Sequence, residues 1–159
     1  MAKSALKNPR FYSGPVLQKD TVRALDGQTW KAGQPGWFDS GYARPAATDN
    51  VVVKFVFSDD QDTAASTSDV KIERIPSAST KFVGYVSTDD ADTDAQRAHV
   101  AQDYGIHVGS NVATVNTGET SNVAVTVDKL LWLEEPLKNA STDSPGQVIF
   151  HYKQSILDA

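Results

Sequence analysis

Short runs of alternating apolar and polar residues, separated by turn formers, constrain this chain most. In residues 51–57 (VVVKFVF), Val51, Val53, Phe55 and Phe57 would share one face of a strand. Further runs of this kind occur at residues 70–74, 81–86, 106–108, 112–115, 123–127, 130–133 and 148–152. Turn clusters separate nearly all of them, as at residues 34–36, 116–118 and 144–146. The spacing predicts a mostly β fold, a compact antiparallel β-sandwich or barrel.

The chain of 159 residues fits one domain and needs no disulfide to fold. Residues 1–10 are small and charged, and Pro9 biases Asn8 toward extended geometry. We therefore expect an extended N-terminal arm at residues 1–10 and a single β-rich domain at residues 11–159. The arm has two interpretations, a frayed end without a role or a segment that becomes ordered on a partner.

One segment departs from the β pattern. Residues 92–105 begin with candidate N-cap residues, continue in helix formers and end in glycine. The apolar stripe of Ala95, Ala98 and Ala101 is small, so a loop with a single helical turn is an equal alternative. The fold should contain at most one short helix.

Charge is distributed unevenly along the chain. The net charge is −5, yet residues 1–31 carry six Lys or Arg against two Asp, and residues 59–94 carry nine acids against three bases. This footprint does not favour nucleic-acid binding. No run approaches the roughly 20 apolar residues of a membrane span, and no secretion signal opens the sequence. We expect a soluble protein that is synthesised in a cytoplasm.

No pattern in the sequence predicts catalysis, a metal or a cofactor. Asp90, Asp92 and Asp94 have the alternate spacing of a calcium loop, but Ala95 and Ala101 occupy the positions that need Gly and Glu. A solvated acidic loop is the preferred interpretation, and the same holds for the acids at residues 59–62. Cysteine is absent, and three histidines lie in separate predicted segments: His99, His107 and His151.

Aromatic residues are dense between Phe11 and Arg44. Trp30 and Trp132 are predicted core residues, because tryptophan is usually well buried. Exposed rings near the turn at residues 34–36 could instead anchor a protein partner or stack on a sugar. The candidate partner-binding residues are Lys7, Arg10, Phe11, Tyr12, Trp37, Phe38 and Tyr42.

Residues 8–58 resemble the capsid decoration, or cement, proteins of tailed bacteriophages. The resemblance rests on a short polar arm, the element TWKAGQ at residues 29–34 with a turn after it, and a Val-rich strand. It implies a non-enzymatic protein without cofactors, synthesised in the host cytoplasm and located on the virion. Its partner would be the major capsid protein, which a homotrimer would clamp from outside the head shell. Deletion of residues 1–10 should then weaken capsid attachment and leave the fold intact.

The sequence is also compatible with two other functions. One is a low-copy virion component, such as a tail or head-completion protein. The other is a carbohydrate- or small-ligand-binding domain that uses Trp37 and Tyr42 as a stacking platform.

Overall fold

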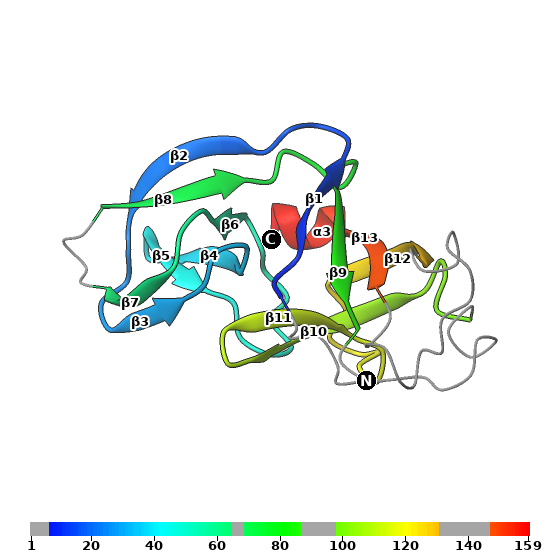
Figure 1. Ribbon diagram of the computed structural model, residues 1–159. Helices are drawn as coiled ribbons and strands as arrows, with labels where there is room; N and C mark the ends of the chain where they lie inside the picture. The colour runs from blue at the N-terminus through cyan, green and yellow to red at the C-terminus, as the bar shows by residue number, and fades with distance from the viewer. Residues whose placement is uncertain (1–6, 65–68, 87–97, 131–146) are drawn as a thin grey trace, which may run out of the picture.

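The described part of the chain folds into two antiparallel sheets, a two-stranded ribbon and one short helix, which confirms the predicted mostly β class. The computed structural model describes residues 7–64, 69–86, 98–130 and 147–159 (Figure 1). The strands in chain order are β1 (Arg10–Ser13), β2 (Gln18–Arg23), β3 (Gln28–Trp30), β4 (Pro35–Asp39), β5 (Tyr42–Pro45), β6 (Phe55–Phe57), β7 (Gln61–Ala64), β8 (Asp69–Arg74), β9 (Lys81–Tyr85), β10 (Asp103–Gly109), β11 (Val112–Asn116), β12 (Val125–Leu130) and β13 (Gln147–Tyr152). The helix α3 (Gln154–Asp158) follows β13.

The larger sheet has six strands in the order β1-β9-β13-β12-β10-β11. A single parallel bridge between Val86 and Val115 joins the ends of β9 and β11. The five strands from β9 to β11 therefore curl into a nearly closed barrel, which this bridge completes. Strand β1 is not part of the barrel wall; it pairs with β9 on the outside.

The smaller sheet has five strands in the order β2-β8-β6-β4-β5. Its two outer strands also approach each other, through a parallel bridge between Ala24 and Ala43 and a hydrogen bond from the Leu25 amide to the Ala43 carbonyl. The two-stranded ribbon of β3 and β7 accompanies it. The two sheets lie side by side, and α3 lies between them (Figure 1).

Each curled sheet encloses its own apolar cluster. The larger cluster fills the interior of the curled six-stranded sheet and includes Phe82, Phe150 and Tyr152. The smaller one contains Trp30 stacked on Phe57, with ring centroids 4.2 Å apart. Trp30 is thus a core residue, as predicted, whereas Trp132 lies outside the described residues.

The strand predicted at residues 51–57 is shorter than its pattern suggests. Only Phe55–Phe57 forms a strand, and Val51 is 43% exposed. Val56 is buried although it points away from Phe55 and Phe57, because β6 contributes to both clusters. The prediction that Val51, Val53, Phe55 and Phe57 share one face, which would be the core face, is therefore wrong. Val51 is exposed, Val53 belongs to the larger cluster, and β6 is buried on both faces.

The turn predicted at residues 34–36 is also misplaced. Pro35 begins β4, and the turn lies upstream, where the Gln34 amide donates to the Lys31 carbonyl at 3.1 Å. Gly33 occupies its third position with φ +83°, a conformation that glycine adopts without steric cost. The sequence Pro-Gly indicated a turn, but the glycine two residues before Pro35 forms it.

Residues 92–105, for which a short helix and a loop with a single helical turn were equal predictions, end in a turn followed by a strand. Residues 98–101 form a turn, Ala101 has φ +65°, and β10 begins at Asp103. Pairing of β10 with β11 and β12 outweighs the weak helical pattern there. Residues 92–97 lie outside the described residues, as do the predicted turn at 144–146 and the predicted strand residues 131–133. The short helix that is observed, α3, was not predicted.

The other predicted strands are present, with ends that differ by a few residues. Val70 and Ile72 point inward on β8 while Lys71 is exposed, as the alternation indicates. No helix in the described part of the chain combines the length and apolar character of a membrane span.

We predict that Phe57→Ala lowers the free energy of unfolding by about 3–5 kcal/mol, because it empties the centre of the smaller cluster. Phe57 is 1% exposed and contacts both Trp30 and Phe55. Phe11→Ala serves as the matched control, since Phe11 is 38% exposed and should cost about 1 kcal/mol. Urea unfolding followed by tryptophan fluorescence would measure both; equal losses would contradict a central role for Phe57.

Candidate functional site

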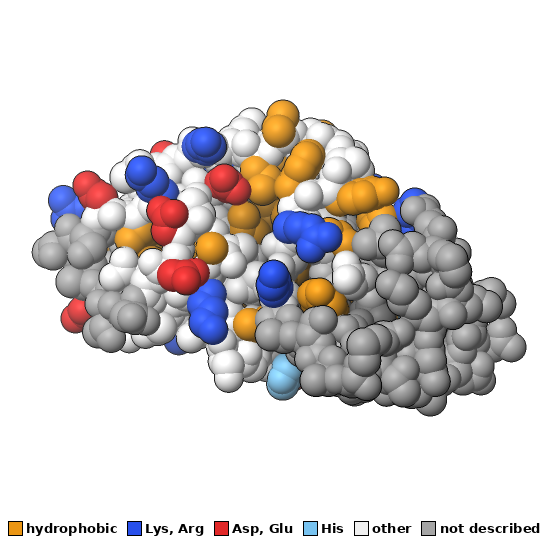
Figure 2. Space-filling model, in the orientation of Figure 1, with side chains coloured by type: hydrophobic (Ala, Val, Ile, Leu, Met, Phe, Trp, Pro, Cys, Tyr) orange, Lys and Arg blue, Asp and Glu red, His pale blue; other side chains and the backbone are white. Residues whose placement is uncertain are grey.

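Strand β1 is an unusually apolar exposed edge. It is the terminal strand of the six-stranded sheet, all four of its residues are exposed, and only Arg10 is charged. Phe11 and Tyr12 lie on it, and Val16, in the turn that follows, is 73% exposed. Figure 2 shows hydrophobic side chains gathered over the upper end of this strand and the turn after it; basic side chains lie lower in the view on the same face. An exposed apolar strand edge is a ready template for pairing with another chain.

The corresponding edge of the smaller sheet has a different character. Strand β2 is also exposed, but it carries Lys19, Asp20 and Arg23. Asp20 accepts a hydrogen bond from Arg74 Nε at 2.8 Å, which lowers the pKa of its carboxyl group. Charged side chains of this kind protect a strand edge against association. Of these two edge strands, β1 of the larger sheet is therefore better suited to pairing with a strand of another chain.

The segment before β1 joins the two halves of the molecule. Asn8 Nδ2 donates to the Ala32 carbonyl at 3.2 Å and to the Asn111 carbonyl at 3.0 Å, and its Oδ1 accepts from the Ala113 amide at 2.7 Å. Ala32 belongs to the turn after β3, whereas the other two groups belong to the β10–β11 hairpin. One side chain thus bridges the two sheets and sets the path of β1.

Two glycines leave the space that this segment occupies. A Cβ at Gly33 would lie 2.9 Å from the Pro9 carbonyl oxygen, and one at Gly84 would lie 3.3 Å from the Pro9 ring. Pro9 is itself buried. Residues 8–10, predicted as part of an extended arm, are therefore packed, and deletion of residues 1–10 would remove structural contacts. Residues 1–6 lie outside the described part of the chain.

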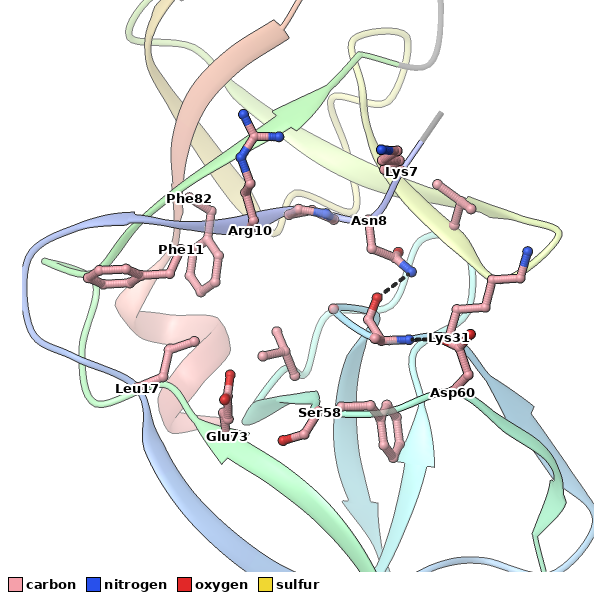
Figure 3. A pocket seen from close by; sticks show the side chains of 16 residues that line it. Lys7, Asn8, Arg10, Phe11, Leu17, Lys31, Ser58, Asp60, Glu73 and Phe82 are labelled. Carbon is pink, nitrogen blue, oxygen red and sulfur yellow. Dashed lines mark hydrogen bonds between the residues drawn. The ribbon is translucent and has the colours of Figure 1, made fainter. Parts of the chain in front are cut away.

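A cleft of about 560 Å³ opens between this segment and the smaller sheet (Figure 3). Residues 7–11 form one side, and residues 56–58 with Glu73 lie across from them. Leu17 and the exposed ring of Phe11 supply apolar surface, and the buried Phe82 borders the cleft. The predicted residues Lys7, Arg10 and Phe11 all line this cleft, so the structure brings these three together.

The cations of the cleft have no acidic partner among the residues that the structure describes. Lys7, Arg10 and Lys31 line it, and within the described residues none of them forms an ion pair. Elsewhere on the described surface, Arg44, Arg74, Lys81 and Lys153 each pair with an aspartate. The cleft therefore retains positive charge that is available to a ligand.

The predicted residues near the β4–β5 turn form a separate surface. Trp37 faces Arg44 across the hairpin, Asp39 faces Tyr42, and an Arg44–Asp39 ion pair of 3.0 Å joins the two pairs. The Arg44 guanidinium covers the Trp37 ring at 5.7 Å. One face of the proposed sugar-stacking ring is thus occupied by the chain itself.

Phe38 and Tyr12 have different surroundings from their sequence neighbours. Phe38 points to the inner face of the hairpin, 4.9 Å from the Phe55 ring, and the Arg74 guanidinium lies over it. Tyr12 lies outside the cleft beside Lys129, whose ammonium is 5.9 Å from the ring. Trp37, Phe38 and Tyr42 therefore do not join the surface made by β1.

A polar cluster lies on the face of the larger sheet opposite its core. Asp128 accepts from Lys81 at 3.2 Å and contacts His151 Nδ1 at 3.0 Å. Asp103 is paired with Lys153 and accepts a 2.7 Å hydrogen bond from Thr126; these two donors lower the pKa of the Asp103 carboxyl group. Within the described residues, no group of three or more His, Asp or Glu is arranged to hold a metal ion.

Asn8, Lys31 and Glu73 are among the contributors to the cleft that sequence reasoning missed. Asn8 had one signal, its position before Pro9, but its partners are about 24 and 105 residues away in sequence. Lys31 and Glu73 had none, because each lies in a different strand region that only the fold brings to the cleft.

Comparison of this chain with protein-family models, curated proteins and solved structures yielded no match.

We predict that Asn8→Ala lowers the free energy of unfolding by about 1–3 kcal/mol, since it leaves the Ala113 amide without its acceptor. Asn122→Ala is the control: that residue is exposed, and its change should stay within about 0.5 kcal/mol. Denaturant unfolding would compare the two variants. A loss no larger than the control's would show that the bridge between the sheets is dispensable.

We predict that Asp103→Asn costs about 0.5 kcal/mol at pH 7, a value typical of partly exposed ion pairs. Because folding lowers the pKa of Asp103, its contribution is present above the ordinary aspartate pKa and disappears as the pH falls through the lowered value. The stabilities of the variant and the wild type should therefore converge as the pH falls below the lowered pKa, toward pH 2 at the acid end of the measurement. Urea unfolding at both pH values is the measurement, with the exposed Asp26→Asn as control; a difference that persists at pH 2 would argue against this linkage.

Proposed function

We propose that this protein is a non-enzymatic structural component of a bacteriophage virion. It binds the outside of the head shell and stabilises it by clamping neighbouring major capsid protein subunits. The observation that carries the proposal is the exposed, apolar edge of β1 with Phe11, Tyr12 and Val16. The resemblance of residues 8–58 to capsid decoration proteins supplies the partner.

Strand addition explains how so short a surface could bind. A partner strand laid along β1 would form main-chain hydrogen bonds, and the exposed rings would bury apolar area on both sides. Each contact would be modest, but many copies on one lattice would reinforce one another. A homotrimer at the three-fold positions of the shell would give each bound unit several such contacts.

The carbohydrate-binding alternative is less well supported. Its stacking platform needs accessible ring faces on Trp37 and Tyr42, and Arg44 already covers one face of Trp37. A low-copy virion component would use the same β1 edge and differs only in stoichiometry. Quantitative mass spectrometry of purified virions separates the two, with the major capsid protein as internal reference. A copy number near that of the capsid protein supports decoration, and a handful of copies indicates a tail or head-completion role.

We predict that Tyr12→Ser weakens attachment to heads at least tenfold, because it removes an exposed ring from the β1 edge. Tyr42→Ser is the matched control, the same substitution at a tyrosine of similar exposure on the β4–β5 hairpin. Co-sedimentation with heads that lack the protein would measure both affinities. A selective loss in the Tyr42 variant would move the contact to the hairpin.

A further inference from the structure

We infer that the cleft beside β1 receives an extended segment of the partner chain, which carries apolar side chains and at least one carboxylate. This inference rests on the proposed function, since the capsid protein would supply the segment. It adds to that function a defined site and the chemistry of what enters it.

The walls of the cleft suit an extended chain. Asn8, Pro9, Arg10 and Phe11 run along one side, and Ser58 and Glu73 lie across (Figure 3). β1 pairs only with β9, so the edge of β1 away from β9 pairs with no strand in the described part of the chain. A segment in the cleft could therefore continue the sheet through main-chain hydrogen bonds.

The interior of the cleft favours apolar side chains in the ligand. Its accessible apolar lining includes Phe11, which is 38% exposed, and Leu17. Val56, Phe57 and Phe82 also border the cleft, but each is at most 4% exposed and offers almost no surface to a ligand. Half-buried Leu17 packs on the larger cluster at the cleft margin. Alternate side chains of an added strand would face this surface.

The charges of the cleft lining determine which polar side chains the bound segment can carry. Lys7, Arg10 and Lys31 have no acidic partner within the described residues, whereas the carboxylate of Asp60 already accepts a 2.8 Å hydrogen bond from the Ala32 amide. Glu73 is the other acid of the lining; it lies across the cleft from the backbone of β1, whereas the Arg10 side chain points to the other side of that strand at the cleft margin (Figure 3). A ligand carboxylate near the three cations is thus favoured, and a ligand with acids along its whole length is not.

The test uses paired charge reversals in the full-length protein. Arg10→Glu with Lys31→Glu alters the cleft, and Lys19→Glu with Arg23→Glu makes the same change of net charge on the exposed β2 edge. Attachment to heads that lack the protein is measured by co-sedimentation at low and high salt. We expect the cleft variant to lose at least tenfold in affinity at low salt, the β2 variant to lose less than twofold, and circular dichroism to show both folded.

A synthetic probe tests the cleft without the capsid. The probe is a fluorescent octapeptide of alternating valine and threonine, with glutamate at the last two polar positions; its control carries lysine there. Anisotropy should show that the glutamate peptide binds the wild type more tightly than the lysine peptide, and that the cleft variant loses this preference.

The outcomes separate this inference from the proposed function. Wild-type attachment with equal effects of both charge reversals, or equal binding of both peptides, overturns the cleft as the site and leaves the proposed function standing. Failure of the wild type to attach to heads overturns the proposed function, and a charge-dependent peptide preference would then still support the cleft as a peptide site.

Discussion

The burial of β6 on both faces is the constraint on which the rest of the molecule depends. Phe55 and Phe57 enter the smaller cluster, while Val56 and the preceding Val53 enter the larger one. Three strand residues therefore join two curled sheets that would otherwise have separate cores. Val53 also donates its amide to the Ile156 carbonyl, so α3 is held at the same junction. Because buried area is removed from water on both faces, polar substitution anywhere in this segment should be costly.

The candidate site depends on this junction, because the cleft exists only where the two sheets meet. Asn8 links the turn after β3 to the β10–β11 hairpin and thereby positions the start of β1. In the described part of the chain, the edge of β1 away from β9 pairs with no strand, and Lys7, Arg10 and Lys31 form no ion pair. Four described cations elsewhere on the surface, Arg44, Arg74, Lys81 and Lys153, are each paired with an aspartate. A surface that is both apolar and electrostatically unsatisfied is the one best suited to association.

The sequence patterns predicted most strand positions correctly. They predicted less well which strand faces are buried and where the turns lie. The alternation at β8 and the apolar runs at β9, β11 and β13 were correct because a strand's period of two is a local property. The strand pattern misled at residues 51–57, because β6 is buried on both faces and alternation cannot show that. The helical pattern misled at residues 103–105, because strand pairing outweighs the weak helical tendency there. The turn signal at Pro35-Gly36 was misplaced because the residue with positive φ is Gly33.

The sequence alone determined the β class, the antiparallel short-strand pattern, the absence of cysteine and the cluster of aromatic and basic residues near the N-terminus. Each of these depends on residue identity or on spacing over a few positions. Only the tertiary structure decided that Lys7, Arg10 and Phe11 share a cleft with Lys31 and Glu73, and that Trp37 and Phe38 lie elsewhere. The physical reason is that the cleft is made by contacts between residues far apart in the chain. Such contacts follow from how the two sheets close and meet, and no local pattern records that.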